Sequence, residues 1–136
     1  MTVDATDDIE SVLAYETIAV VGCSSTPGKA AHEVPKYLLE HGYDIVPVNP
    51  FADAVFDREA ADTLADVGET IDVVCVFRPS EEVSDIVDAT LERDDVHAIW
   101  TQSGIRDDDA AARAAADGRT VVQDRCMKVE HRRLVA

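Results

Sequence analysis

The sequence predicts a doubly wound α/β domain with a parallel sheet of about five strands. Apolar, β-branched runs alternate with helical stripes along the chain, which is the pattern that right-handed βαβ crossovers produce. One run, residues 71–77, is almost continuously apolar, as expected of a strand that is buried on both faces. Another, residues 17–21, ends at a glycine and leads through small residues into a helical pattern. Together these observations indicate a Rossmann-like fold with helices on both faces of the sheet.

The expected elements follow in chain order from hydrophobic spacing and turn residues. Strands are expected at residues 17–21, 43–48, 71–77, 96–101 and 119–123. Helices are expected after Lys29, where Gly42 ends the stripe, and at residues 80–91, 107–117 and 124–134, with a short helix at 60–65. Pro35 is expected in the first turn of its helix, and Ser80 is expected to be an N-cap. The last helix is expected to pack through Met127, Val129 or Leu134.

The 136 residues of the chain are the size of one domain and suffice to bury a hydrophobic core. The sequence contains no internal repeat and no low-complexity segment. Ile9, Val12 and Leu13 have helical spacing near the N-terminus. We therefore expect residues 1–16 to form an extension that packs on a domain formed by residues 17–136.

The charge of the chain is strongly acidic, since 28 Asp and Glu stand against 12 Lys and Arg and the formal net charge is -16. This balance argues against nucleic acid and against an anionic membrane surface as partners. Because hydrophobic residues make up an ordinary 46%, the excess charge must lie on the surface of a folded domain. Such a surface resembles those of proteins from salt-loving organisms, in which high salt screens the self-repulsion. We expect the fold to depend on high ionic strength.

The spacing of the cysteines and the sequence of the N-terminus indicate which metal sites and which cellular compartment to expect. Cys23, Cys75 and Cys126 lie far apart, without a C-x-x-C pair or a histidine at ligand spacing, so neither a zinc site nor a disulfide framework is expected. The first ten residues are acidic and lack the pattern of a signal peptide, and no apolar run has the length of a membrane span. A cytoplasmic location, no metal and no membrane are expected.

Residues 17–29 have the pattern of a strand, a phosphate-binding loop and the start of a helix. Gly22 lets the backbone approach a ligand closely, and a helix that begins after Lys29 offers unpaired N–H groups at the positive end of its dipole. An anion is expected there, with Lys29 as its counter-charge. The alternative is an ordinary turn with a solvated lysine.

The loops that follow the strands, here called the strand exits, lack acidic residues. No Asp or Glu occurs in residues 17–32, 45–52, 73–80 and 96–106. The exits instead carry the cations Lys29, Arg78 and Arg106 and the polar residues Ser24, Ser25, Asn49, Gln102 and Ser103. The helices after the two arginines begin with acidic residues that complement the helix dipole, whereas the helix after Lys29 has none before Glu33. We expect one acid-free, basic rim, with the first loop held open for phosphate.

The end of the second expected strand bears on the identity of the ligand. A dinucleotide such as NAD normally meets an acidic residue there, which holds the ribose hydroxyls. Here the strand ends in Asn49 and Pro50, and Asp44 lies at its beginning. A rim without acids suits a nucleotide whose ribose carries its own phosphate. The residues alone leave coenzyme A (CoA) and NADP as two open choices.

Seven segments resemble, in order, the small stand-alone CoA-binding domain proteins. They are residues 21–29, 34–38, 42–43, 47–50, 76–78, 100–105 and 122–126. The fold of that family is similar to the CoA-binding domain of the succinyl-CoA synthetase α subunit. The resemblance covers roughly residues 17–134 and implies a Rossmann-like domain that binds CoA or an acyl-CoA at the strand exits.

The resemblance also implies site residues. It places Gly22, Cys23 and Ser24 against the backbone of the ligand, Lys29 at phosphate, Asn49 and Pro50 beside the nucleotide, Phe77 and Arg78 at the third exit, and Gln102, Ser103, Gly104 and Ile105 at the fourth. Pro27 of the first loop is also expected among the cofactor-binding residues. Two departures put individual hydrogen bonds in doubt. Cys23 stands where alanine is common, and Ala30 and Ala31 stand where a small hydroxyl residue is often found.

The expected function is a CoA-binding module that acts as carrier, sensor or partner of an acyl-CoA enzyme, without established chemistry of its own. Two alternatives remain open. One is an NAD(P)-linked redox sensor. The other is a thiol-exchange enzyme that uses Cys126, whose neighbours Arg125 and Lys128 are cations of the kind that favours a reactive thiolate. The competing interpretation of Cys126 is a small buried side chain.

Overall fold

The computed structural model describes residues 2–136, which form a five-stranded parallel sheet of order β2-β1-β5-β6-β7. The strands are β1 (Thr17–Val21), β2 (Asp44–Val48), β5 (Val73–Val76), β6 (Ala98–Thr101) and β7 (Thr120–Val122). Each strand lies within a predicted run. Four of the runs extend beyond their strand by one or two residues at one or both ends. The doubly wound, Rossmann-like fold is therefore confirmed.

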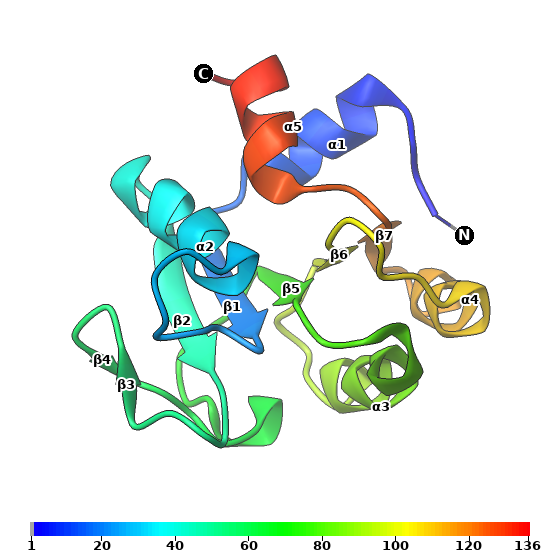
Figure 1. Cartoon of the computed structure of the whole chain (residues 1–136). Helices are drawn as coiled ribbons and strands as arrows, with labels where there is room; N and C mark the ends of the chain where they lie inside the picture. The colour runs from blue at the N-terminus through cyan, green and yellow to red at the C-terminus, as the bar shows by residue number, and fades with distance from the viewer. Residues whose placement is uncertain (1) are drawn as a thin grey trace.

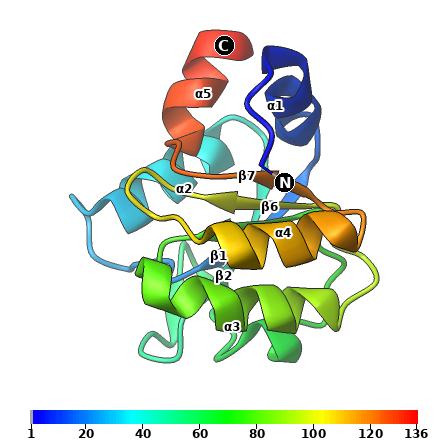
Figure 2. The ribbon, with the colours of Figure 1, turned by 90° about the vertical axis from the view of Figure 1, so that its right-hand side faces the viewer.

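Helices cover both faces of the sheet (Figures 1 and 2). The helices are α1 (Thr6–Leu13), α2 (Ala30–Glu40), α3 (Ser80–Leu91), α4 (Asp108–Ala116) and α5 (Met127–Leu134). Figure 2 shows α1 and α5 on one face and α3 and α4 on the other. Helix α2 shares the core of α1 and α5. No helix among residues 2–136 is long and apolar enough to cross a membrane.

Alternation along the strands divides the core into two layers. Ile18 and Val20 of β1 pack with α1, α2 and α5, whereas Ala19 between them packs with α3 and α4. All four residues of β5 are buried, as its continuous apolar run predicts.

The connection from β2 to β5 differs from the prediction. In place of a helix at residues 60–65 it contains a small hairpin, β3 (Ala54–Val55) with β4 (Arg58–Glu59), and a single 3-10 turn, η1 (Leu64–Asp66). Phe56 and Asp57 link the hairpin strands with φ of 56° and 60°, the left-handed conformation that tight hairpins need. Because this connection passes from one side of β1 to the other, β1 marks the point where the winding of the sheet reverses (Figure 1).

Two local predictions are wrong, and a third, the packing of the last helix through Met127, Val129 or Leu134, is confirmed for Met127 and Leu134. Helix α2 begins at Ala30, so Pro35 lies in its second turn rather than its first. The N-cap of α3 is Pro79, and the Ser80 hydroxyl instead accepts the Arg106 N–H at 3.0 Å. On α5, Met127 is buried and Leu134 packs on the core, but Val129 is exposed.

The N-terminal segment lies against the last helix and the last strand. Ile9, Val12 and Leu13 of α1 are buried in the same core as α5. The Tyr43 hydroxyl donates to the carbonyl of Leu13, which connects this helix to the start of β2. Val3 donates its N–H to Val121 of β7 at 2.8 Å, so the chain joins the edge of the sheet before α1 begins.

The excess of negative charge lies at the surface. Glu130 is the only buried carboxylate among residues 2–136, and Arg133 and Arg125 hold it at 2.7 and 3.3 Å. The screening length is about 10 Å in 0.1 M salt and about 3 Å in 1 M salt, so repulsion between exposed carboxylates opposes folding mainly in dilute salt. We expect the helical far-UV circular dichroism signal to be lost near 0.1 M salt and regained above about 1 M. An unchanged spectrum across this range would contradict salt dependence.

A buried histidine connects α5 to α2 and β2. The Nδ1 atom of His131 lies 2.8 Å from the Tyr37 hydroxyl, and the rings of His41 and Tyr43 lie against it at centroid distances of 5.2 and 5.6 Å. Lys128 approaches the Tyr37 ring at 5.5 Å. Burial, and to a smaller degree His41, lower the pKa of His131. Protonation of this residue therefore opposes the docking of α5.

The stability of the protein should accordingly fall in mild acid. A lowered folded-state pKa means that the contribution of neutral His131 is complete above the unfolded value of about 6.5 and is lost as the pH falls below it. We expect the melting temperature in high salt to drop between about pH 7.5 and 5.5, before most carboxylates titrate. A His131→Gln variant should show a flatter profile over this range; equal slopes in the two proteins would exclude His131 as the cause.

Candidate functional site

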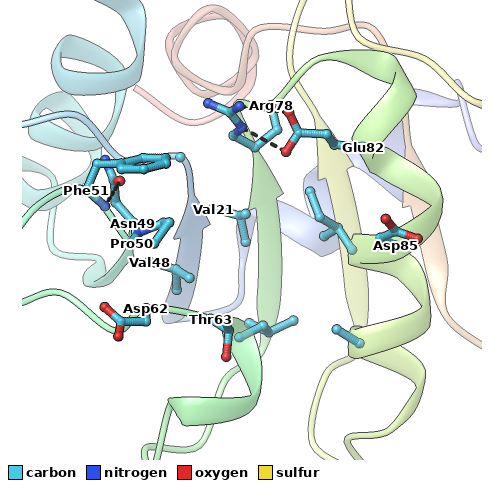
Figure 3. Close-up of a pocket in the computed structure, with 14 residues that line it drawn as sticks. Val21, Val48, Asn49, Pro50, Phe51, Asp62, Thr63, Arg78, Glu82 and Asp85 are labelled. Atoms are coloured by element: carbon cyan, nitrogen blue, oxygen red, sulfur yellow. Dashed lines mark hydrogen bonds and ion pairs between the residues drawn. The ribbon is translucent and has the colours of Figure 1, made fainter.

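A cavity of about 280 Å³ opens at the carboxyl ends of β1 and β2. It is lined by residues 21–22, 48–51 and 62–64, by Arg78 and by one side of α3 from Glu82 to Ala89 (Figure 3). Its apolar walls come from Val21, Val48, Leu64, Ile86 and Ala89. This is the position beside the winding reversal where open α/β sheets bind ligands.

Gly22 ends β1 at the edge of this cavity. It has φ of +89°, and its N–H donates to the Val48 carbonyl at 2.8 Å. A Cβ at this position would lie 2.9 Å from Cδ of Arg78 and 3.2 Å from the Phe77 carbonyl oxygen. Glycine is therefore required here both by the left-handed backbone and by the close approach of the third exit.

Asn49 fixes the turn that follows β2. Its Nδ2 donates to the Cys23 carbonyl at 2.9 Å, and its Oδ1 accepts the Phe51 N–H at 2.8 Å. The first bond holds the exit of β2 to the exit of β1, and the second orders the backbone of the next residues. The Phe51 ring nevertheless remains 91% exposed while it lines the cavity.

Arg78 lines the opposite side of the cavity and forms an ion pair with Glu82 in the first turn of α3. Its Nε lies 3.1 Å from Oε1, and its Nη2 lies 2.7 Å from Oε2. The hydrogen bonds from Arg78 are the main reason why the pKa of Glu82 is lowered. The positive charge of Arg78 is therefore neutralised by a carboxylate of the same chain.

The prediction of an acid-free rim is wrong. Asp62, Glu82 and Asp85 line the cavity, and Asp108 pairs with Arg106 at 2.9 Å. The exit loops themselves contain no acids, but the segments folded against them do. The sequence of an exit loop does not show which carboxylates fold against it. Those of the cavity come from the next helix and from the connection around η1.

The first loop is closed onto α2 by an unusual bond. Pro35 has no N–H, so the Ala31 carbonyl one turn earlier has no partner within the helix. That carbonyl accepts the Ser24 N–H at 2.9 Å, and the Ser24 carbonyl lies 2.7 Å from Nδ1 of His32. Pro35 in the second turn thus helps to order the loop, and the Ser24 N–H already has a partner.

A carboxylate of the chain also reaches the start of α2. The Gly28 N–H donates to Oε2 of Glu33 at 3.1 Å, and this bond is the largest cause of the lowered pKa of Glu33, with smaller effects from Lys36, His32 and Lys128. Lys29 is the exposed N-cap residue of α2 and lies outside the cavity lining. In the first turn, the His32 and Glu33 N–H groups donate to the Lys29 carbonyl at 2.9 and 2.8 Å, whereas those of Ala30 and Ala31 make no hydrogen bond among residues 2–136.

The fourth exit is organised by internal hydrogen bonds. Gln102 is buried; its Nε2 donates to Sγ of Cys75 at 2.9 Å, and its Oε1 accepts the Met127 N–H at 3.1 Å. The Gly104 N–H donates to Asp124 at 2.6 Å, and the Ile105 carbonyl accepts the Thr101 hydroxyl at 2.7 Å. Ser103 is exposed. None of the residues 102–105 lines the cavity.

The three cysteines differ in exposure. Cys23 and Cys75 are buried, and burial raises the pKa of Cys23 to about 12 and also raises that of Cys75. Neither is a thiolate at neutral pH. Cys126 is partly exposed and precedes the first turn of α5, so it is the accessible thiol among the three.

The structure thus brings together some of the predicted site residues. Those that line the cavity are Gly22, Asn49, Pro50 and Arg78, whereas Cys23, Ser24, Pro27, Lys29 and Phe77 do not. Sequence reasoning missed Phe51, Asp62, Thr63 and the side of α3 that carries Glu82, Asp85, Ile86 and Ala89. The spacing of these four helix residues was a usable signal, because it places them on one face.

A second cavity, of about 440 Å³, lies between β2, β4 and η1. Its lining includes the carboxylates Glu59, Asp62, Asp66 and Glu69. This concentration of negative charge disfavours an anionic ligand. The cavity at the ends of β1 and β2 has mainly apolar walls and is therefore the better candidate for an apolar or aromatic group of a ligand.

The chain forms a small α/β domain in which a loop leads from Gly22 into a helix and a cavity lies where the winding reverses. These are the features of a Rossmann-like ligand-binding domain. A model of the family described as CoA binding domain matches residues 16–132. The chain belongs to this family.

Comparison with individual proteins agrees. The chain is 39% identical over 114 residues to the uncharacterized protein YneT of Bacillus subtilis, and the match spans 84% of each chain. It is 38% identical to a Thermus thermophilus protein of solved structure, with a TM-score of 0.90 over 96% of this chain and 99% of that one. It is also 23% identical over 103 residues, or 74% of its length, to acetate–CoA ligase [ADP-forming] II of Archaeoglobus fulgidus, of which the match covers 15%. The chain therefore corresponds to one region of that ligase.

Proposed function

We propose that this domain binds CoA or an acyl-CoA at the carboxyl ends of its strands and serves as a cytoplasmic carrier, sensor or partner module. The observation that carries the proposal is the apolar cavity between the exits of β1 and β2, next to Gly22, in a chain of the CoA-binding domain family. Similarity to a region of an acetate–CoA ligase supports the same ligand class.

The residues present fit the parts of such a ligand. Val21, Leu64 and Ile86 offer an apolar wall to a nucleoside, and Asn49 keeps the two exits together. The first turn of α2 and Lys29 are the groups suited to phosphate, because they combine unpaired N–H groups with a positive charge. Bound CoA would supply a thiol that carries acyl groups.

The carboxylates of the cavity make NAD the necessary comparison. Asp62 lines the same cavity as Asn49, although it follows the β3–β4 hairpin rather than β2. A carboxylate can accept hydrogen bonds from the free ribose hydroxyls of NAD and repels a ribose phosphate. An NAD-linked sensor is therefore the second candidate function, and ligand ranking separates the two.

Thermal melts of the purified protein in high salt with CoA, acetyl-CoA, NAD and NADP test this proposal. A ligand at about 100 times its dissociation constant adds about 2.7 kcal/mol to the stability, which is readily measured. We expect CoA or acetyl-CoA to give the largest shift and native mass spectrometry to show co-purified CoA. A shift with NAD and none with CoA would overturn the proposal.

The phosphate role of Lys29 can be tested in the same assay. Lys29→Glu should weaken CoA binding without lowering the melting temperature of the free protein, because the side chain is exposed. Arg132→Glu on α5 is a matched control with the same charge change at another exposed position. Equal CoA affinity in the two variants would remove Lys29 from the site.

A further inference from the structure

Phe51 is the most exposed large apolar side chain among residues 2–136. Its backbone is ordered, because its N–H donates to Asn49, and its ring lines the mouth of the apolar cavity. Exposure of an aromatic ring to water is unfavourable, and burial of its surface against a ligand would recover that free energy. The ring is therefore positioned to gain from a flat apolar partner.

Arg78 presents a second flat group. Its two hydrogen bonds to Glu82 form a fork that fixes the plane of the guanidinium. The two side chains are 42% and 46% exposed, so the ion pair contributes little to stability and its main effect is orientation. Gly22 leaves the space that the Arg78 stem occupies. Guanidinium planes stack well on aromatic rings.

The sheet sets the spacing of the two strands from which these groups extend. Phe51 follows β2 and Arg78 follows β5, and these strands are the two neighbours of β1. Neighbouring strands are about 4.8 Å apart, so the ends of β2 and β5 are about 9 to 10 Å apart. A flat ring with a contact on each face needs about 7 to 8 Å. Figure 3 shows Phe51 and Arg78 on either side of the carboxyl end of β1.

We propose that Phe51 and Arg78 form a clamp that stacks on both faces of the ligand's purine base. The inference rests on the proposed function and specifies which part of CoA enters this cavity. A phosphate is the poorer occupant, because Glu82 already matches the charge of Arg78 and Asp62 and Asp85 line the same space. The phosphates then lie toward the first turn of α2.

Calorimetric titration of the full chain in about 2 M KCl, where long-range electrostatics are screened, tests the clamp. The two probes are CoA and phosphopantetheine, which lacks the base. Phe51→Ala should weaken CoA binding about 5- to 100-fold, the range that base stacking on one aromatic ring provides, and leave phosphopantetheine unchanged. Phe51→Tyr should keep the affinity of the wild type. Leu39→Ala, at another exposed apolar position, is the control.

Arg78→Lys separates stacking from charge. Lysine keeps the positive charge but has no flat face, so the clamp predicts weaker CoA binding and unchanged phosphopantetheine binding. Retention of CoA affinity in this variant would overturn the role of Arg78 as a stacking group.

The remaining outcomes distinguish the two proposals. Equal CoA affinity in the wild type and Phe51→Ala overturns the clamp and leaves CoA binding intact. Absence of CoA binding to the wild type overturns the proposed function. Adenosine is then titrated into the same proteins, and an adenosine affinity that does not depend on Phe51 overturns the clamp as well.

Discussion

Replacement of Gly22 by alanine is expected to damage both the fold and the site. The residue has φ of +89°, a conformation that costs about 1 to 2 kcal/mol for a residue with a Cβ. The new methyl group would lie 2.9 Å from Cδ of Arg78 and 3.2 Å from the Phe77 carbonyl oxygen, so the arginine must move. We expect the free energy of unfolding to fall by about 2 kcal/mol and CoA affinity to fall at least about tenfold.

Gly118→Ala is the matched control for this variant. Gly118 has φ of +85°, but a Cβ there would meet no atom within 4 Å, and it follows α4 rather than a strand exit. It should lose similar backbone stability and keep its ligand affinity. If the two variants bind CoA equally well in titrations, the approach of Arg78 to Gly22 has no part in binding.

Replacement of Trp100 by alanine is expected to cause the largest loss of stability. The side chain lies in β6, is fully buried in the core shared with α1, α2 and α5, and donates from Nε1 to the Arg125 carbonyl at 2.8 Å. Truncation removes this bond and leaves a cavity, which typically costs about 3 to 5 kcal/mol for a buried aromatic residue. We expect a large fall in the urea midpoint in high salt.

Circular dichroism is the suitable probe for that experiment, because Trp100 is the single tryptophan of the chain and fluorescence is lost with it. Trp100→Phe retains a large ring without the hydrogen bond and should lose clearly less stability. A loss below about 1 kcal/mol for the alanine variant would mean that the core relaxes around the deletion.

Elements with strong local signals were predictable from the sequence. The continuous apolar run that contains β5 identifies a strand buried on both faces, and α4 is bounded by Asp107, whose side chain caps the Ala110 N–H at 3.0 Å, and by Gly118. In both cases the sequence signal is local and agrees with the tertiary packing, in which β5 pairs with β1 and β6.

The errors arose where distant segments decide the structure. Pro35 is tolerated in the second turn of α2 because the loop before the helix supplies the missing hydrogen bond through Ser24. The carboxylates of the cavity come from α3 and from the segment after β4, which no analysis of the exit loops alone includes. The sequence gives no signal for Phe51, because its proposed role depends on its position relative to Arg78 across β1.

The most direct test of a CoA site at the ends of β1 and β2 is an amide NMR titration of the folded protein with CoA in high salt. We expect the resonances of Gly22, Asn49, Phe51 and Arg78 to shift together and to saturate with one dissociation constant. Shifts confined to the acidic cavity around Glu59 and Glu69, or no shifts at any CoA concentration, would contradict the assignment of this site.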